Sequence, residues 1–180
     1  SGGIPYVSWT FRKAAKFFDV VTYTGNGLDR SISHSLGQSP GMIIVKSASL
    51  GGSAAYNWFV WHRSLGASEF LQLNTIDAIV SGGSMFYPTA QVPTASVFYV
   101  GGNAGVNASG ATYIAYLFAH DTATTGLIQC GSISSGQTTL NLGWEPQYVL
   151  YKRTDSVGGW AVEDVSRAFT AGPNPAQYAV

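Results

Sequence analysis

Few residues of this chain could perform chemistry, and none lies in a catalytic or metal-binding spacing. The three histidines, His34, His62 and His120, are too widely separated for the i, i+2 or i, i+4 spacing of paired metal ligands. Each is therefore expected to be hydrogen-bonded or solvated in a structural role. Cys130 is the only cysteine, which excludes an intrachain disulfide and a thiolate metal cluster. Its apolar sequence context predicts a small buried side chain.

Acidic residues are scattered singly along the chain. A glycoside hydrolase requires two carboxyl groups facing each other across a cleft. Gly37-Gln38-Ser39-Pro40-Gly41 has the Gly-x-Ser-x-Gly spacing, but the expected strand 42–45 follows it rather than a helix, so a hydrolytic serine lacks its usual context. We therefore predict no catalytic, cofactor-binding or metal-binding residue, and we expect that the protein is not an enzyme. The carboxylates that could still form a pair are Glu69, Asp77, Glu145, Glu163 and Asp164.

The strongest pattern is an internal repeat, two copies of which lie about 106 residues apart. A repeat of this kind sets the unit of folding. The match extends upstream to Gly27 and Gly136, and downstream to Trp58 and Trp160. Residues 6–11 also resemble residues 113–118. The two core copies read Leu36-Gly37-x-x-Pro40-x-x-Ile43-Ile44-Val45-Lys46 and Leu142-Gly143-x-x-Pro146-x-x-Val149-Leu150-Tyr151-Lys152.

The repeat predicts the domain organisation. Residues 17–121 form one complete unit, and residues 1–16 hold the closing strand of a preceding unit and a linker. Residues 122–180 form the first half of a second, related unit. Half a unit alone would leave an apolar face and strand edges exposed. We therefore expect either a piece of a longer polypeptide or a chain that closes its sheets with partner chains.

The tryptophans have two possible roles. Trp58 and Trp160 occupy matching positions, which is typical of core anchors in a β-sandwich. Exposed tryptophans can instead stack on sugar rings. Trp61 has no counterpart in the second copy and is the better candidate for such a platform.

The chain is predicted to be all-β, with a β-sandwich-like repeat unit of about 106 residues and partial units on each side. No apolar stripe of helical period runs beyond one or two turns. Gly25-x-Gly27 and the glycines at 101–105 are interpreted as hairpin turns rather than phosphate cradles. The expected strands are 7–11, 18–24, 31–33, 42–45, 58–61, 70–73, 97–100 and 112–118.

Charge is unusually scarce in this chain. Charged residues make up 10%, against about 25% in a typical soluble domain, and the formal net charge is zero. Without a basic stripe, nucleic acid is not an expected partner. No apolar run approaches the roughly 20 residues of a membrane helix, so no membrane insertion is expected. Polar but uncharged surfaces are typical of extracellular binding modules and tightly associated oligomers.

Several segments carry a resemblance to known proteins: Trp9-Thr10-Phe11, residues 17–27, Leu36-Gly37-x-x-Pro40-Gly41-Met42-Ile43-Ile44-Val45-Lys46, residues 60–66 and residues 107–121. Together they resemble a repeated domain of virion proteins from tailed phages, especially marine and cyanobacterial phages. The resemblance implies a non-enzymatic structural virion protein, either a tail-fibre or adsorption module or a surface decoration, that acts by multivalent binding. It also implies packing against copies of itself, with a trimer as the favoured assembly, contacts with other virion proteins, and a host surface glycan as a candidate ligand. The alternatives are a carbohydrate-binding module and, less favoured, a polysaccharide-degrading enzyme.

Overall fold

The chain is an all-β protein in the computed structural model, which describes residues 8, 10–51, 57–66, 68–86, 91–123, 125–137 and 140–165. The predicted all-β class is confirmed. In chain order the elements are β1 (Phe18–Thr24), β2 (Arg30–Ser33), β3 (Pro40–Ser47), β4 (Phe59–His62), β5 (Glu69–Gln72), β6 (Val80–Ser81), β7 (Val97–Val100), α1 (Ala104–Asn107), β8 (Thr112–Ala119), β9 (Tyr148–Lys152) and β10 (Trp160–Asp164).

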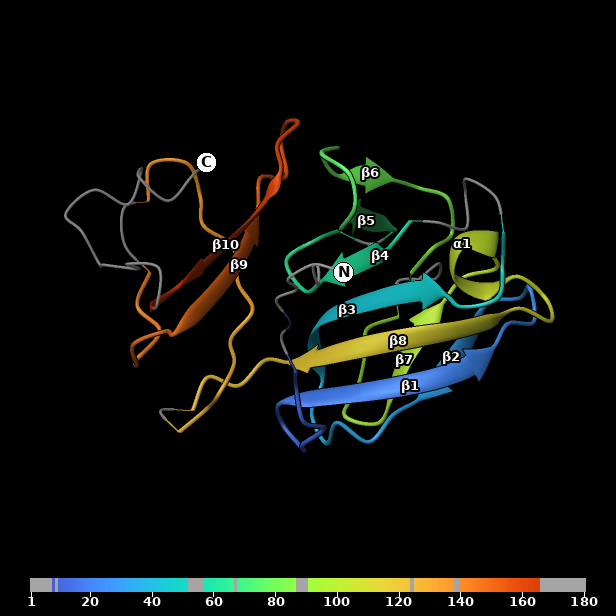
Figure 1. Cartoon of the computed structure of the whole chain (residues 1–180), viewed down its shortest axis with the longest axis horizontal. Coiled ribbons are helices and arrows are strands. Elements are labelled where there is room, and N and C mark those ends of the chain that lie inside the picture. The colour runs from blue at the N-terminus through green and yellow to red at the C-terminus, as the bar shows by residue number, and fades with distance from the viewer. Residues whose placement is uncertain are drawn as a thin grey trace, which may run out of the picture.

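The main body is a six-stranded antiparallel sheet in the order β1-β8-β3-β4-β5-β6, with a β2–β7 ribbon packed on one face (Figure 1). Alternation along β8 directs Tyr113, Ala115 and Leu117 into the core between the two layers, where each is fully buried. Phe98 and Val100 of β7 meet them from the ribbon and are also fully buried. The sheet and the ribbon thus form a two-layer, sandwich-like core.

The opposite face of the six-stranded sheet carries a second apolar cluster. Ile44, Val60 and Leu71 form its buried centre. Partly buried side chains surround them: Met42, Trp58, Leu65, Leu73, Ile79, Tyr116, Phe118 and Trp160. We call this set the outer cluster. Both faces of the sheet are therefore apolar, which explains the continuous apolar run in the sequence of β3.

The prediction that the turn at Gly25-x-Gly27 closes a hairpin is wrong. β1 pairs with β8, whereas β2 pairs with β7, so this turn carries the chain from one layer to the other. A Cβ on Gly25 would lie 2.2 Å from the carbonyl oxygen of Ala108. The glycines at 101–105 are not a hairpin turn either, because they lead into α1. Turn residues mark a chain reversal but do not specify which strands pair across it.

The buried side-chain amide of Asn107 joins the turn between β1 and β2 to the segment that leads into α1. The Asn107 side chain is fully buried, and its Oδ1 accepts a hydrogen bond from the Asn26 N–H at 3.0 Å. Its Nδ2 donates to the carbonyl oxygens of Leu28 at 2.6 Å and Gly101 at 3.1 Å. Asn107 therefore holds the β1–β2 crossing and the approach to α1 together.

Strand prediction was accurate where the sequence alternates or is strongly apolar. The ranges predicted for β1 and β7 agree with the structure, and those predicted for β2, β3, β4, β5 and β8 differ from it by one or two residues at an end, whereas the short strand β6 was not predicted. The strand predicted over 7–11 falls largely on residues outside the described set. Phe11 itself belongs to no strand, and its ring packs against the rings of Phe18 and Phe118 at centroid distances of 5.5 and 6.0 Å.

We expect Gly41→Ala to destabilise the protein by about 2 kcal/mol, because the added methyl overpacks a closed site. A Cβ at Gly41 would lie 2.6 Å from Cβ and 2.7 Å from Sγ of Cys130. Urea unfolding near neutral pH measures the effect. Gly131→Ala is the matched control, since a Cβ at Gly131 would have no other atom within 4 Å. Equal free energies of unfolding for the two variants would show that the Cys130 side chain can move aside without loss of stability.

Candidate functional site

The sequence repeat has a direct structural counterpart in two β-hairpins. In the β3–β4 hairpin, Ile44 lies opposite Val60 and Val45 opposite Phe59. In the β9–β10 hairpin, the matching pairs are Leu150 opposite Val162 and Tyr151 opposite Ala161. The two hairpins therefore share one pairing register, although the loop between Lys152 and Trp160 is shorter than that between Lys46 and Trp58.

Backbone conformation repeats as well. Gly37 and Gly143, which precede the matched strands, have φ of 71° and 76°. Upstream, Gly27 and Gly136 have φ of 75° and 83°. Residues with a Cβ rarely adopt this left-handed region, so glycine at these positions is a conformational requirement. The repeat therefore extends from the sequence to turn geometry and strand register.

The second hairpin docks on the outer cluster of the first unit. The Trp160 indole packs within that cluster, and its Nε1–H donates to the carbonyl oxygen of Gln72 at 2.9 Å. Two main-chain hydrogen bonds support the contact: Ile79 N–H to Thr154 O at 3.0 Å, and Gly158 N–H to Ile76 O at 2.8 Å. We call this contact the repeat junction. It has an apolar centre with polar bonds on each side.

The matched tryptophans both lie in the outer cluster, as expected of anchors. Trp58 stacks on Tyr116 with ring centroids 6.0 Å apart and an interplanar angle of 27°. The prediction for Trp61 is wrong, because its side chain is only 8% exposed and belongs to the core between the layers. Its place on β4 next to Ile43 turns it inward, away from any sugar in solution.

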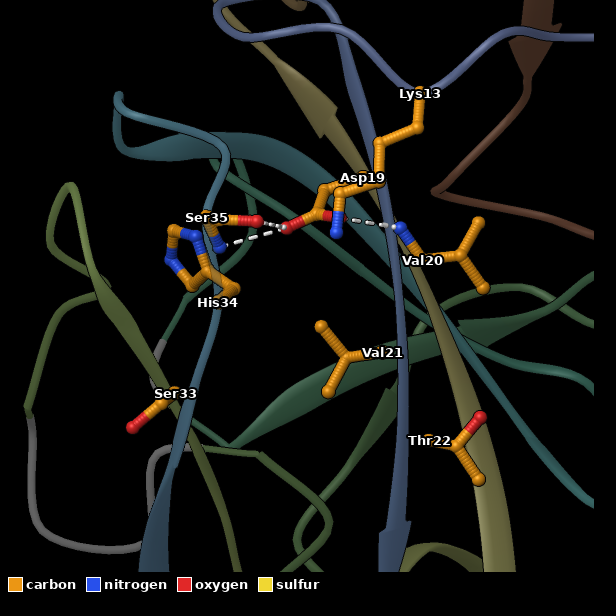
Figure 2. Close-up of a pocket in the computed structure, with 8 residues that line it drawn as sticks. All are labelled: Lys13, Asp19, Val20, Val21, Thr22, Ser33, His34 and Ser35. Carbon is orange, nitrogen blue, oxygen red and sulfur yellow. Dashed lines mark hydrogen bonds and ion pairs between the residues drawn. The ribbon is translucent and has the colours of Figure 1, made fainter.

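A shallow pocket of about 390 Å³ opens where β1 passes the end of β2 (Figure 2). In Figure 2 the side chain of Val21 reaches from β1 toward the segment that carries Ser33, His34 and Ser35. The polar group deepest in this region is the Asp19 carboxylate, which is fully buried. None of the five carboxylates singled out from the sequence lines the pocket, whose walls are Lys13, Asp19, Val20, Val21, Thr22, Ser33, His34 and Ser35.

The Asp19 carboxylate is satisfied within the chain. It accepts hydrogen bonds from the Ser35 N–H at 2.7 Å and the Ser35 hydroxyl at 3.1 Å, and it pairs with Lys13 Nζ at 2.5 Å. Burial alone would raise the pKa of Asp19, but the bonds from Lys13 and Ser35 outweigh it and hold the pKa below its usual value. With its charge compensated, Asp19 fastens β1 to the segment after β2. The Asp19 carboxylate therefore links two segments of the fold and, being ionised, has no proton to donate as a catalytic acid.

The Nδ1 atom of each of the three histidines accepts a hydrogen bond from a main-chain N–H. The donors are Leu36 at 3.2 Å for His34, Ser64 at 3.2 Å for His62, and Cys130 at 3.0 Å for His120. These bonds suit the neutral imidazole. Within the residues that the structure describes, no three His, Cys, Asp or Glu side chains gather as metal ligands.

His62 and His120 lie close to Cys130 at one end of the sheet. Burial raises the pKa of the Cys130 thiol to about 12, with the Arg63 charge a smaller opposing effect. The thiol therefore remains protonated at neutral pH and is a poor nucleophile. Burial, Arg63 and His120 lower the pKa of His62 to about 4. Burial and Arg63 also lower the pKa of His120. The side chains of His62, His120 and Cys130 are therefore mainly uncharged at neutral pH.

The His62 shift predicts a loss of stability in acid. Its folded-state pKa lies below the ordinary 6.5, so the unfolded chain binds a proton first as the pH falls. The contribution of neutral His62 is complete above pH 6.5 and is lost between about pH 6.5 and pH 4, at a cost of about 3 kcal/mol. Urea unfolding across this range should show a smaller loss for His62→Asn, whose Oδ1 can replace Nδ1 as the acceptor. Parallel curves for the two proteins would contradict this assignment.

The remaining predicted carboxylates are not arranged as a catalytic pair. Glu69 accepts a hydrogen bond from the Gly66 N–H at 2.6 Å, which fixes a tight turn. Glu163 and Asp164 are neighbours on β10 and so point to opposite faces of the hairpin. Asp164 occupies the position of His62 in the first hairpin, opposite Tyr148.

Sequence reasoning missed the two buried polar anchors, Asp19 and Asn107. Asp19 could have been noticed as a lone charge inside the apolar strand Phe18–Thr24, a pattern typical of a charge held inside an edge strand. Asn107 carries no comparable signal, since its partners at Leu28 and Gly101 are distant or unremarkable in sequence.

No helix in the described part of the chain has the length and apolar character needed to cross a membrane.

Comparison with protein families gives a match over nearly the whole chain. The model of a family described as a domain of unknown function, DUF7483, matches residues 4–177. No curated protein and no solved structure matches the chain.

Proposed function

We propose that this chain, which belongs to the DUF7483 family, is a non-enzymatic structural module that assembles by packing repeated β units against one another. Within that role we propose a place in the virion of a tailed phage, as a tail-fibre, adsorption or surface-decoration component. The virion assignment is supported by the motif resemblance in the sequence. Its partners would be copies of itself and other virion proteins, and its action would be multivalent binding.

The observation that carries the proposal is the repeat junction. A hairpin with the register of β3–β4 packs its matched tryptophan on the outer cluster and bonds it to Gln72. Since the first unit carries the same kind of hairpin, this contact offers a way to join one unit to the next. Low charge is consistent with surfaces that meet other protein surfaces rather than water alone.

Two observations disfavour the alternatives. The best candidate for a sugar platform, Trp61, is buried, and among the described residues no tryptophan, tyrosine or phenylalanine lines the pocket beside β1. The pocket's only carboxylate is neutralised by Lys13 and Ser35, and the thiol of Cys130 stays protonated. Neither group has the exposure or ionisation of a nucleophile or general acid.

Sedimentation velocity tests the proposal. We expect the chain to move from monomer to larger species between micromolar and near-millimolar concentration, because its low charge suits surfaces that meet other protein surfaces. A glycan array probed with the same protein separates the carbohydrate-binding alternative. A chain that stays monomeric at near-millimolar concentration and binds a glycan would overturn the structural role.

A further inference from the structure

The turn after β1 contains a dipeptide that can modify itself. Asn26 is exposed there, and Gly27 follows it. A glycine after asparagine favours deamidation, because without a Cβ its nitrogen can approach the side-chain amide carbon of the asparagine. The other asparagines of the sequence all precede larger residues: Asn57, Asn74, Asn103, Asn107, Asn141 and Asn174.

In the folded chain, both reacting groups of this dipeptide are held by hydrogen bonds. The nucleophile would be the Gly27 nitrogen, whose N–H donates to the main-chain carbonyl oxygen of Asn107 at 2.7 Å. The Oδ1 of Asn26 accepts the Leu28 N–H at 3.0 Å and the Asn107 Nδ2 at 3.3 Å. Ring closure therefore requires Gly27 to leave Asn107 and the Asn26 side chain to leave Leu28.

Further bonds fix the turn to the segment between α1 and β8, which lies beside it (Figure 1). The Asn26 N–H donates to the buried Oδ1 of Asn107 at 3.0 Å. The Gly25 N–H donates to the Ala111 carbonyl at 2.8 Å, and the Gly110 N–H donates to the Gly25 carbonyl at 3.0 Å. Several of these bonds must break together before the turn opens, so the reactive geometry belongs to a minor, locally opened state.

We propose that Asn26 is a site of spontaneous deamidation whose rate is set by the bonds between Asn107 and the turn. In the opened turn, the Gly27 nitrogen attacks Cγ of Asn26 and forms a new C–N bond. The bond from Cγ to the side-chain nitrogen breaks, and that nitrogen leaves as ammonia with the proton that Gly27 gives up. Water then opens the cyclic imide at either carbonyl, which yields aspartate or isoaspartate. The reaction consumes only water, and it does not depend on self-assembly.

The isoaspartate product would loosen the crossing from β1 to β2. Its main chain passes through Cβ and Cγ, so the chain gains an extra atom between Gly25 and Gly27. Both glycines are bonded to the segment after α1, and a Cβ on Gly25 would already lie 2.2 Å from the Ala108 carbonyl oxygen. The added length therefore has no room while these bonds persist. The aspartate product keeps the main-chain length and an acceptor for the Leu28 N–H.

Timed incubation at mildly alkaline pH, followed by peptide mapping that separates aspartate from isoaspartate, tests the proposal. A synthetic peptide of residues 23–30 gives the rate without the fold. We expect Asn26 to react roughly tenfold or more slowly in the wild-type chain than in the peptide, because only the locally opened state reacts. Asn107→Ala should react at a rate between these two. Asn141→Ala, which removes one exposed local bond to the Gly143 N–H, is the matched control and should react like the wild type.

Hydrogen exchange provides a measurement that needs no variant, should Asn107→Ala fail to fold. The Gly27 amide hydrogen must leave its bond to Asn107 both to exchange and to allow ring closure. We therefore expect this amide in the wild-type chain to exchange more slowly than in the peptide of residues 23–30. Equal exchange in the two would contradict the role given to the Asn107 carbonyl.

The outcomes decide between a reaction controlled by the fold and one controlled by sequence alone. Modification concentrated at Asn26, fastest in the peptide and slowest in the wild-type chain, supports the proposal. Equal rates at Asn26 in the peptide and the wild-type chain would overturn it, as would modification at other asparagines with Asn26 left intact. An isoaspartate form that unfolds at the same urea concentration as the unmodified chain would overturn the predicted loosening of the crossing.

Discussion

Asn107→Ala should destabilise the protein by about 4 kcal/mol, the largest single effect we expect. The substitution removes the partner of the Asn26 N–H and of the Leu28 and Gly101 carbonyls at one buried point. Each buried main-chain group left unsatisfied costs about 1–3 kcal/mol. Because these groups lie on two separate chain crossings, both should loosen together. Urea unfolding followed by tryptophan fluorescence measures the loss.

Asn141→Ala is the matched control for that experiment. Asn141 is exposed, and its Oδ1 accepts one local hydrogen bond from the Gly143 N–H at 2.9 Å. Its removal should cost less than about 1 kcal/mol. Similar losses in the two variants would mean that Asn107 does not hold the crossings together.

Trp160→Ala should detach the second hairpin from the first unit. The indole supplies an apolar contact within the outer cluster and the hydrogen bond to Gln72 O. Full truncation of a buried aromatic residue costs about 3–5 kcal/mol, so about 2–3 kcal/mol is expected for this half-buried one. Hydrogen–deuterium exchange should then show faster exchange in β9 and β10, while β3 and β8 keep their protection.

Trp160→Phe is the control, because it retains an apolar ring but loses the N–H donor. Its exchange should lie between that of the wild type and that of the alanine variant. If β9 and β10 remain as protected in Trp160→Ala as in the wild type, then the repeat junction does not depend on this side chain.

The sequence was most informative where its pattern reflects local geometry. The β-branched and aromatic residues of Phe18–Thr24 predicted β1, and the continuous apolar run over Met42–Val45 predicted a strand covered on both faces, which β3 is. The repeat was visible because identical strand registers and left-handed glycines need similar residues. The domain boundaries at 16 and 121 and the number of units stay predictions.

What sequence reasoning missed depends on contacts between distant segments. Nothing near Gly25 indicates that β1 joins β8 while β2 joins β7, since both partners lie far along the chain. Trp61 was judged by its lack of a repeat counterpart, but strand parity decides its direction and places it beside Ile43 in the core. Asp19 and Asn107 acquire their roles only once Ser35, Leu28 and Gly101 are brought to them.

Electron cryomicroscopy of the assembled wild-type chain would test the central claim most directly. We expect ordered assemblies in which the repeated β units of neighbouring copies pack against one another. A protein found only as isolated monomers at high concentration would contradict the structural role itself.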